Sequence, residues 1–283
     1  MESIVFALVL GGAAMHAAWN AVVKGSGDPL IAIALVTAGS GSAALMLLPF
    51  IGWQVAPEAW IWIAGSALAH ILYRLALVRG YEIGDMSLVY PIARGSAPLL
   101  TALIGVTLLS ETVSRLAFAG ILTIVAGVIG ISMARRGLAM AKNTAAVGFA
   151  LLTAVLITTY TYLDGFGARV SGNASAYTVL LFVVDTPVML AIALWRRGPD
   201  RIVAAFRRTS LISFGGGILS FLSYWIAIWA MTKVPIPLVA ALRETSIAFG
   251  ALIAVIFLGE RVTPVRIAAT LAILSGAALL RFA

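Results

Sequence analysis

Residues 94–127 read RGSAPLLTALIGVTLLSETVSRLAFAGILTIVAG, and residues 243–276 read RETSIAFGALIAVIFLGERVTPVRIAATLAILSG. The two stretches align without a gap, so that Arg94 falls on Arg243 and Glu111 falls on Glu260. Chance matching of two apolar runs would recover some aliphatic residues, but not both arginines and both glutamates in one register. The sequence therefore contains a duplicated unit. Each copy holds an apolar helix with an arginine inside it, a glutamate at the end of that helix, and a second apolar helix.

The composition is that of a membrane protein. Of the 283 residues, 62% are hydrophobic and 11% are charged, and the mean hydropathy is +1.07. A soluble core cannot bury that much apolar surface. The formal charge of +8 comes from bases in short connections rather than from one polar face, so we expect no nucleic-acid partner. The absence of cysteine excludes disulfides and thiolate metal sites. The first apolar run has no basic residue before it and is expected to be a retained span.

Ten apolar segments are long enough to cross a bilayer, which takes about 20 residues. They are predicted at residues 4–23, 30–52, 59–79, 85–109, 115–134, 145–165, 174–195, 211–231, 236–258 and 264–281. Each copy of the repeat then contains five spans, and an odd number of spans reverses the direction of the chain. The two halves should therefore be inverted, and such folds bind substrate near the membrane midplane between the halves.

This organisation predicts an all-α integral membrane protein with ten transmembrane helices in two inverted five-helix repeats. The first repeat is expected at residues 1–134, a connector at 135–144 and the second repeat at 145–283.

Lysine and arginine are unevenly distributed between the two sides of the predicted bundle. One set of connections carries twelve, namely Lys24, Arg79, Arg135, Arg136, Lys142, Arg196, Arg197, Arg201, Arg207, Arg208, Arg261 and Arg266. The opposite connections and the C-terminal tail carry four, namely Arg115, Arg169, Lys233 and Arg281. Because lysine and arginine resist translocation, the first set is predicted to be cytoplasmic and both termini are predicted to lie outside.

Three arginines, Arg74, Arg94 and Arg243, lie inside predicted spans. An arginine at a helix centre costs a few kcal/mol and should face the bundle interior or a wet cavity with a partner. A guanidinium is a permanent cation whose planar fork suits carboxylate or phosphoryl oxygens, so we predict that Arg94 and Arg243 contact substrate. The alternative is structural pairing with Asp185 and Glu244, which also lie deep in spans. Adjacent helical residues project about 100° apart, so Glu244 could reach Arg94 or another helix rather than Arg243.

Other polar and aromatic residues follow helical spacing around these arginines. Besides the arginines, the candidate substrate-binding residues are His16, Trp19, Asn20, His70, Tyr73, Tyr90, Tyr224 and Trp225. Asp164, Asp185 and Glu244 are candidates for coupling or gating. Histidine changes charge near neutral pH, so proton coupling through His16, His70, Asp185 or Glu244 is a further hypothesis. Pro91 and Pro98 are expected to interrupt the span at 85–109, and interrupted helices commonly line transport sites. Each aromatic could instead be ordinary packing, and Glu111 and Glu260 are expected to pair locally.

The order of these residues resembles the drug/metabolite transporter superfamily, in its EamA-type ten-helix branch. The resemblance covers the whole chain and rests on His16-x2-Trp19-Asn20-x3-Lys24, on Pro98-x12-Glu111 and on Leu258-Gly259-Glu260-Arg261-Val262-Thr263, which is similar to the family's L-G-E-R-hydrophobic-T signature. The first half departs from that signature with Leu109-Ser110-Glu111-Thr112, and the second half has Ile247 where the first has Pro98. The resemblance implies a bacterial inner-membrane protein with a central site lined by the first, third, fourth, sixth, eighth and ninth spans.

The leading interpretation is a secondary transporter for a small metabolite with a carboxylate, phosphate or phosphonate group, working by alternating access. No cofactor, no metal site and no enzymatic activity are expected, since the chain has no D-x-x-x-D or H-x-x-x-H arrangement. The alternatives are an exporter of amino acids, amines or drugs, preferred if the arginines are fully paired, and a lipid-carrier flippase of the same fold. The expected partners are the substrate, the lipid bilayer and either a proton or a counter-substrate. Both a monomer and a homodimer are compatible with the sequence.

Overall fold

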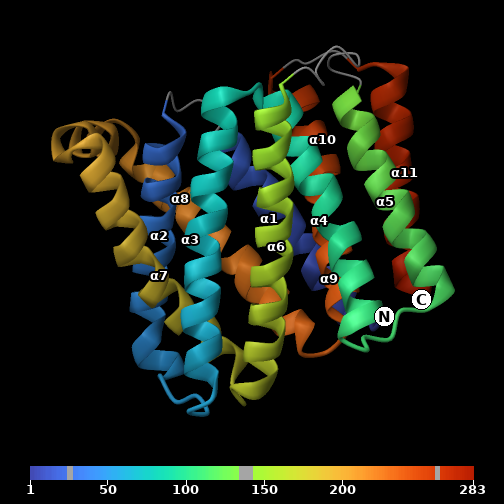
Figure 1. Cartoon of the computed structure of the whole chain (residues 1–283), viewed down its shortest axis with the longest axis horizontal. Coiled ribbons are helices and arrows are strands. Elements are labelled where there is room, and N and C mark those ends of the chain that lie inside the picture. Colours follow the sequence, from blue (N-terminus) through green and yellow to red (C-terminus); the bar gives the residue numbers. More distant parts are fainter. Residues whose placement is uncertain (24–27, 134–142, 259–261) are drawn as a thin grey trace.

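The computed structural model describes residues 1–23, 28–133, 143–258 and 262–283, and these residues form helices joined by short connections (Figure 1). The helices are α1 (Ser3–Val23), α2 (Pro29–Ile51), α3 (Ala59–Ile83), α4 (Met86–Leu108), α5 (Arg115–Met133), α6 (Thr144–Val170), α7 (Ala174–Arg197), α8 (Pro199–Met231), α9 (Ile236–Arg243), α10 (Ser246–Leu258) and α11 (Pro264–Phe282). The predicted functional or topological residues Lys24, Arg135, Arg136, Lys142, Glu260 and Arg261 lie outside the described residues.

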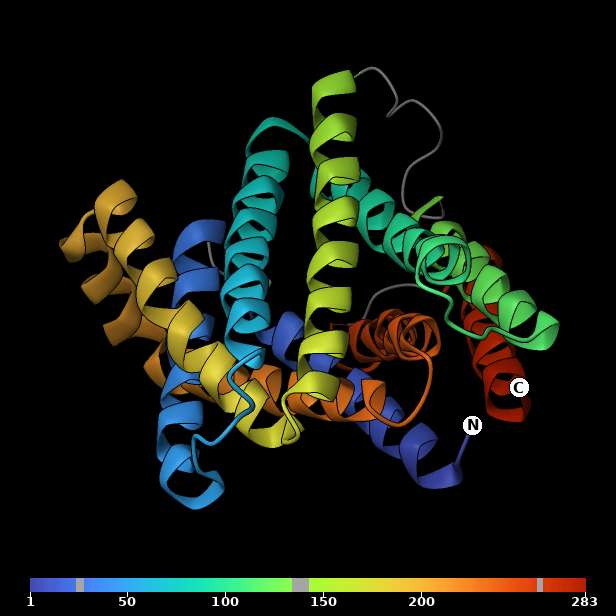
Figure 2. The same ribbon diagram turned by 60° about the horizontal axis from the view of Figure 1, so that its bottom comes forward.

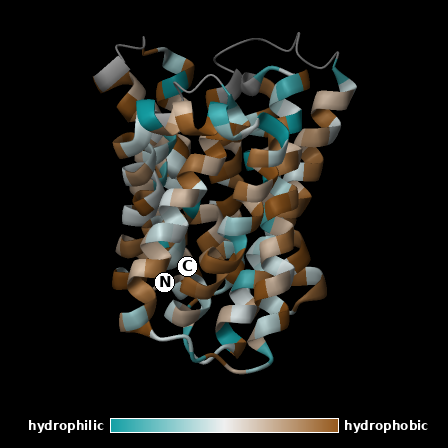
Figure 3. Cartoon of the chain, turned by 90° about the vertical axis from the view of Figure 1, so that its left-hand side faces the viewer, coloured by the Kyte–Doolittle hydropathy of each residue, from teal (hydrophilic) through white to brown (hydrophobic). Residues whose placement is uncertain are grey.

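The helices confirm the predicted membrane spans. In the described part of the chain, nine apolar stretches are long enough to cross a membrane, with α9 and α10 together forming one of them, Ile236–Ile256. The tenth span is α5, whose apolar stretch Arg115–Ile131 is shorter. Large apolar side chains cover the outer surface, as at Phe50, which is 85% exposed, and Ile61, which is 75% exposed. Figure 3 shows hydrophobic residues along the outward-facing helices. Such a surface is suited to lipid rather than to water.

The two ends of the bundle differ in what they contain. Both chain termini lie at one end, the lower end in Figure 1, where Arg281 donates to the carbonyl oxygen of Met1 at 2.7 Å and to the hydroxyl of Ser3 at 2.6 Å. We call this the terminal end. We call the opposite end, where α2, α4, α6, α8 and α11 begin, the basic end, because Arg197, Arg208 and Arg266 belong to helix segments there.

The two repeats are inverted, and helices of one repeat make equivalent contacts with helices of the other. Helix α3 packs along α6, and its counterpart α8 packs along α1, which is the counterpart of α6. Helix α5 packs directly against its counterpart α11, and the pair runs along one edge of the bundle (Figure 2). Gly120 and Gly276 permit this close approach, since a Cβ added to Gly276 would lie 2.7 Å from the carbonyl oxygen of Gly120. The exchange of partners between halves is the pattern that a pseudo-two-fold axis produces.

The predicted connection between residues 196 and 210 is wrong, because most of it is helical. Helix α8 starts at Pro199 and passes through one non-helical residue, Thr209, whose φ is −129° and ψ is 15°. Proline is favoured in the first turn of a helix and Asp200 complements the helix dipole there, so the segment has its own start signal. The exposed bases of this segment are Arg201, Arg207 and Arg208.

The predicted span at 236–258 is present, but its helix is divided, because α9 and α10 are separated at Glu244 and Thr245. The backbone tightens there: the amide of Glu244 donates to Ala241 and that of Thr245 donates to Leu242, at 3.0 and 3.1 Å. The hydroxyl of Thr245 also donates to the carbonyl of Leu242 at 2.7 Å. Helix α4, which contains Pro91 and Pro98, remains one element. The interruption thus occurs in the second half, which has Ile247 at the position that matches Pro98.

Candidate substrate cavity

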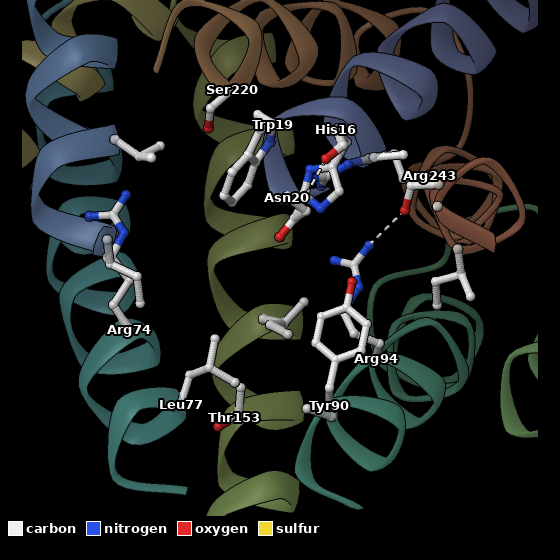
Figure 4. A pocket seen from close by; sticks show the side chains of 18 of the residues that line it. His16, Trp19, Asn20, Arg74, Leu77, Tyr90, Arg94, Thr153, Ser220 and Arg243 are labelled. Atoms are coloured by element: carbon white, nitrogen blue, oxygen red, sulfur yellow. Dashed lines mark hydrogen bonds between the residues drawn. The ribbon is translucent and has the colours of Figure 1, made fainter. Parts of the chain in front are cut away.

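A cavity of about 720 Å³ lies in the middle of the bundle between the two repeats. This volume falls within the usual range for small-molecule sites. The lining includes Pro29 at the start of α2, exposed Asp85 before α4 and Arg266 at the start of α11, so the cavity opens at the basic end. Its deeper wall is formed by polar side chains from seven helices, several of which appear in Figure 4: His16, Trp19, Asn20, His70, Tyr73, Arg74, Tyr90, Arg94, Tyr160, Ser220, Tyr224, Arg243 and Ser246.

Arg94 forms an ion pair across the boundary between the repeats. Its Nε lies 3.1 Å from Oε2 of Glu244, and both residues are buried, with 8% and 4% exposure. Its terminal nitrogen also donates to the hydroxyl of Ser246 at 3.5 Å, the contact drawn as a dashed line from Arg94 in Figure 4. Glu244 occupies the break between α9 and α10, which gives its side chain access to α4. The pairing of Glu244 with Arg94, left open by the sequence, is therefore present.

Arg74 is paired with Asp185. Its Nη1 lies 2.7 Å from Oδ1 and 2.6 Å from Oδ2 of that carboxylate, which is 2% exposed. The sequence left open a pairing of Asp185 with Arg94 or Arg243, and Asp185 contacts Arg74 instead. Asp185 lies on α7, and α7 packs against α3, which carries Arg74, rather than against α4 or α9.

Arg243 is placed differently from the other two arginines. Its guanidinium carbon lies 4.8 Å from the centroid of the Tyr224 ring, a cation–π contact. Among the described residues, no carboxylate oxygen lies within 4.0 Å of its guanidinium nitrogens. The side chain is half-buried and lines the cavity near His16 and Arg94 (Figure 4). Arg243 therefore presents a positive charge to the cavity, with no counter-charge from the described part of the chain in direct contact.

A buried carboxylate, Asp164 of α6, lies beside the deep end of the cavity and is fully buried. Its Oδ1 accepts hydrogen bonds from the hydroxyls of Ser66 and Tyr177, the latter at 3.1 Å. Its Oδ2 accepts a hydrogen bond from the hydroxyl of Tyr224 and lies 3.1 Å from Nε2 of His70. The carboxylate thereby joins α3, α6, α7 and α8, and two of its partners, His70 and Tyr224, line the cavity.

Aromatic rings form a wall next to this carboxylate. The His70 ring stacks on Tyr160, with 4.0 Å between centroids and 18° between planes, and Tyr73 lies 5.3 Å from Tyr160. On the opposite side, His16 meets Trp19 edge to face at 5.2 Å. Tyr160 was missed as a site residue by the sequence analysis. The signal was available, because Tyr160 and Asp164 lie one helical turn apart and so share a face of α6.

The structure brings together every predicted substrate-binding residue except Trp225. The Trp225 indole donates to the hydroxyl of Ser175 at 3.0 Å and its ring packs 5.5 Å from Phe221, so it does not line the cavity. Its neighbour Tyr224 does, as expected for adjacent residues that project in different directions from a helix. The carboxylates of Asp164, Asp185 and Glu244 do not line the cavity themselves. Each contacts residues that do: Asp164 contacts His70 and Tyr224, Asp185 contacts Arg74, and Glu244 contacts Arg94.

The cavity is closed toward the terminal end. Arg169 at the end of α6 lies 2.6 Å from Glu111, through Nη1 and Oε1, and donates from Nε to the carbonyl of Met231 at 2.9 Å. The hydroxyl of Tyr162 donates to the carbonyl of Thr101 at 2.5 Å. These contacts join α4, α6 and α8 on that side. The local pairing predicted for Glu111 is confirmed, whereas Glu260 lies outside the described residues.

Ten apolar spans in two inverted repeats, with a polar cavity between them that opens at one end, define a membrane transport protein. The chain belongs to the EamA-like transporter family, whose model matches residues 3–133 and 144–282, and thereby to the drug/metabolite transporter superfamily. A solved structure titled only "Crystal structure of protein" has the same fold, with a TM-score of 0.78 and 18% sequence identity over 99% of each chain. Among curated proteins, no match is found.

Proposed function

We propose that this protein is a secondary transporter for a small metabolite that carries a carboxylate, phosphate or phosphonate group. The observation that carries the proposal is Arg243, a cation in the wall of the central cavity with no carboxylate in ion-pair contact among the residues described. An arginine inside a membrane span is costly unless it has a polar or charged partner. An anionic substrate would supply that partner.

The other arginines and acids of the deep cavity support this assignment. Arg74 is paired with Asp185, and Arg94 is paired with Glu244. An amine substrate would need a carboxylate to contact. Asp185 and Glu244 already contact a guanidinium, and Asp164 is fully buried with four partners of its own. Arg243 is left to bind a substrate oxygen, and the Tyr224 ring holds its guanidinium in place.

The neighbouring donors suit the oxygen atoms of an anion. Tyr90, Asn20 and Trp19 line the same part of the cavity as Arg243 (Figure 4). The indole nitrogen of Trp19 is buried and has no hydrogen-bond partner among the described residues. A buried donor without a partner costs free energy, and a carboxylate or phosphoryl oxygen of the substrate would offset that cost.

Transport by alternating access would use the inversion of the two repeats. The cavity is open at the basic end and closed at the terminal end by the contacts of Arg169. In the second state, the terminal end would open and the basic end would close around the same central site. With the basic end in the cytoplasm, as the distribution of lysine and arginine predicts, the state described would be open to the inside.

Uptake into proteoliposomes tests the proposal. The purified protein would be assayed with labelled phosphonates, sugar phosphates and acidic amino acids, and with amines as the competing class. Replacing Arg243 by Ala removes a charge-assisted interaction worth about 1.5–3 kcal/mol, so the KM for a transported anion should rise by roughly tenfold or more. The matched control is Arg208→Ala, an exposed arginine on α8 that lies outside the cavity, and it should leave the KM unchanged. Uptake of amines but of no anion would overturn the assignment.

A further inference from the structure

The three buried carboxylates in the described spans are not equivalent. Asp185 and Glu244 each contact an arginine, whereas the described side chains that contact Asp164 are the neutral hydroxyls of Ser66, Tyr177 and Tyr224 and the imidazole of His70. An arginine holds its proton under all ordinary conditions, but an imidazole gains or loses one near neutral pH. Of these three contacts, the His70–Asp164 pair is thus the one without an arginine.

We propose that the His70–Asp164 pair is a proton-binding site that couples one proton to the transport of the anion, so that the two are carried in the same direction. The inference rests on the proposed function, because it assumes an anion bound at Arg243.

The hydrogen bonds of the pair leave one position for a proton. A carboxylate offers about four lone-pair sites, and Asp164 has four partners, so its oxygens are saturated. His70 directs Nε2 at that carboxylate, and its Nδ1 is buried with no hydrogen-bond partner in the described part of the chain. A proton added to the Nδ1 lone pair would convert His70 to an imidazolium. Its charge would be balanced by Asp164 at 3.1 Å.

A short series of contacts connects this pair to the proposed anion site. The hydroxyl of Tyr224 donates to Asp164, and the ring of the same tyrosine carries the Arg243 guanidinium at 4.8 Å. A positive charge on His70 would strengthen the attraction of this region for an anion. By linkage, proton binding at the pair and anion binding at Arg243 would favour each other by the same factor.

The surrounding groups do not compete for this role. The titratable and charged groups facing the pair are Tyr73 and Arg74 of α3, Tyr160 of α6, Tyr177 and Asp185 of α7, Tyr224 of α8 and Arg243 of α9, with the Arg94 and Glu244 pair beyond them. The arginines stay charged, and the two other carboxylates are held by arginines. His16 lines the cavity near Arg94 and Arg243, and no carboxylate lies within ion-pair distance of it among the described residues, so a second positive charge there would be opposed.

The test compares two modes of transport in the same proteoliposomes, with the membrane potential clamped at zero. Counterflow of labelled against unlabelled anion requires binding and alternation but no net proton movement. Accumulation driven by a pH gradient requires coupling, and one proton per anion allows at most about a tenfold accumulation per pH unit. The wild-type protein should perform both, whereas His70→Gln should lower the ratio of gradient-driven accumulation to counterflow at least fivefold, whatever its absolute rate.

The ratio of gradient-driven to counterflow uptake separates the outcomes. His16→Gln serves as the matched histidine variant, and its ratio should equal that of the wild type whatever its absolute rate. If anion counterflow runs but the pH gradient has no effect, or if His70→Gln keeps the wild-type ratio, the coupling inference is overturned and the proposed function stands. If no anion moves in either mode, both are overturned.

Discussion

Arg94 of the first repeat and Glu244 of the second form an ion pair across the centre of the bundle, with 3.1 Å between Nε and Oε2. The residue of the second repeat that matches Arg94 is Arg243, and it faces the cavity with no carboxylate in contact among the described residues. One acidic side chain, placed next to Arg243 in sequence, therefore neutralises the arginine of the other repeat. This asymmetry leaves one of two duplicated arginines available to a ligand.

The Arg94–Glu244 pair should show the energetics of a buried ion pair. Arg94→Gln and Glu244→Gln each leave an uncompensated charge inside the membrane span, and each should destabilise the folded protein by about 3 kcal/mol or more. The double variant should be more stable than either single variant, because it buries no unpaired charge. Thermal unfolding of the three purified variants in detergent measures this. Additive destabilisation in the double variant would mean that the two side chains do not interact.

Arg169 should act as part of the closure at the terminal end. The chain has no cysteine, so Ser220→Cys places a single thiol in the cavity wall. A membrane-impermeant maleimide should label this thiol from the basic end, where the cavity opens. Adding Arg169→Gln removes the 2.6 Å contact with Glu111 and should raise labelling from the terminal end severalfold.

The matched control for the closure is Arg115→Gln, an exposed arginine that is also at the terminal end. It should leave the labelling pattern of Ser220→Cys unchanged. Equal effects of the Arg169 and Arg115 changes would indicate a general loss of charge at the surface rather than the opening of a closure.

The distribution of lysine and arginine predicts the basic end on the cytoplasmic side. Glu58 before α3 and Arg208 on α8 are exposed at opposite ends of the bundle, so each can carry a single reporter cysteine. In intact cells, an impermeant thiol reagent should label Glu58→Cys and should label Arg208→Cys only after the membrane is opened. The reverse pattern would show that both termini are inside.

Asp164→Asn should destabilise the bundle more than an ordinary surface change does. An amide replaces one acceptor oxygen by an NH₂ donor, which cannot accept from the hydroxyls of Ser66, Tyr177 or Tyr224. Each buried donor left without a partner costs about 1–3 kcal/mol. The melting temperature in detergent should therefore fall clearly, whereas Glu2→Gln, an exposed carboxylate near the N-terminus, should leave it unchanged. An unaltered melting temperature for Asp164→Asn would contradict the four-partner arrangement.

Much of the fold could be predicted because the bilayer imposes simple rules. The inverted architecture could be predicted from three features: the length of the spans, the odd number of spans in each repeat, and the recurrence of Arg94 at Arg243. The cost of a charge in lipid directed Arg74, Arg94 and Arg243 toward the interior, and all three line the cavity.

The details that the sequence did not predict depend on which helices are neighbours. Asp185 pairs with Arg74 because α7 packs against α3, and no periodicity within α7 contains that information. The break at Glu244 has no proline or glycine to mark it; the Thr245 hydroxyl and the contact with Arg94 accompany it instead. The start of α8 was missed because the basic residues in its first turns are typical of a connection between two spans. Each of these features arises from tertiary contacts rather than from local propensity.

The central claim is that Arg243 binds an anionic group of the substrate, and an equilibrium dissociation constant tests it most directly. The affinity of a transported anion would be measured by titration calorimetry on purified wild-type protein, Arg243→Lys and Arg243→Ala. We expect a Kd at least tenfold higher for Arg243→Ala, with part of the loss recovered by Arg243→Lys, which keeps the charge but not the planar fork. An unchanged Kd in Arg243→Ala would show that Arg243 does not bind the anionic group.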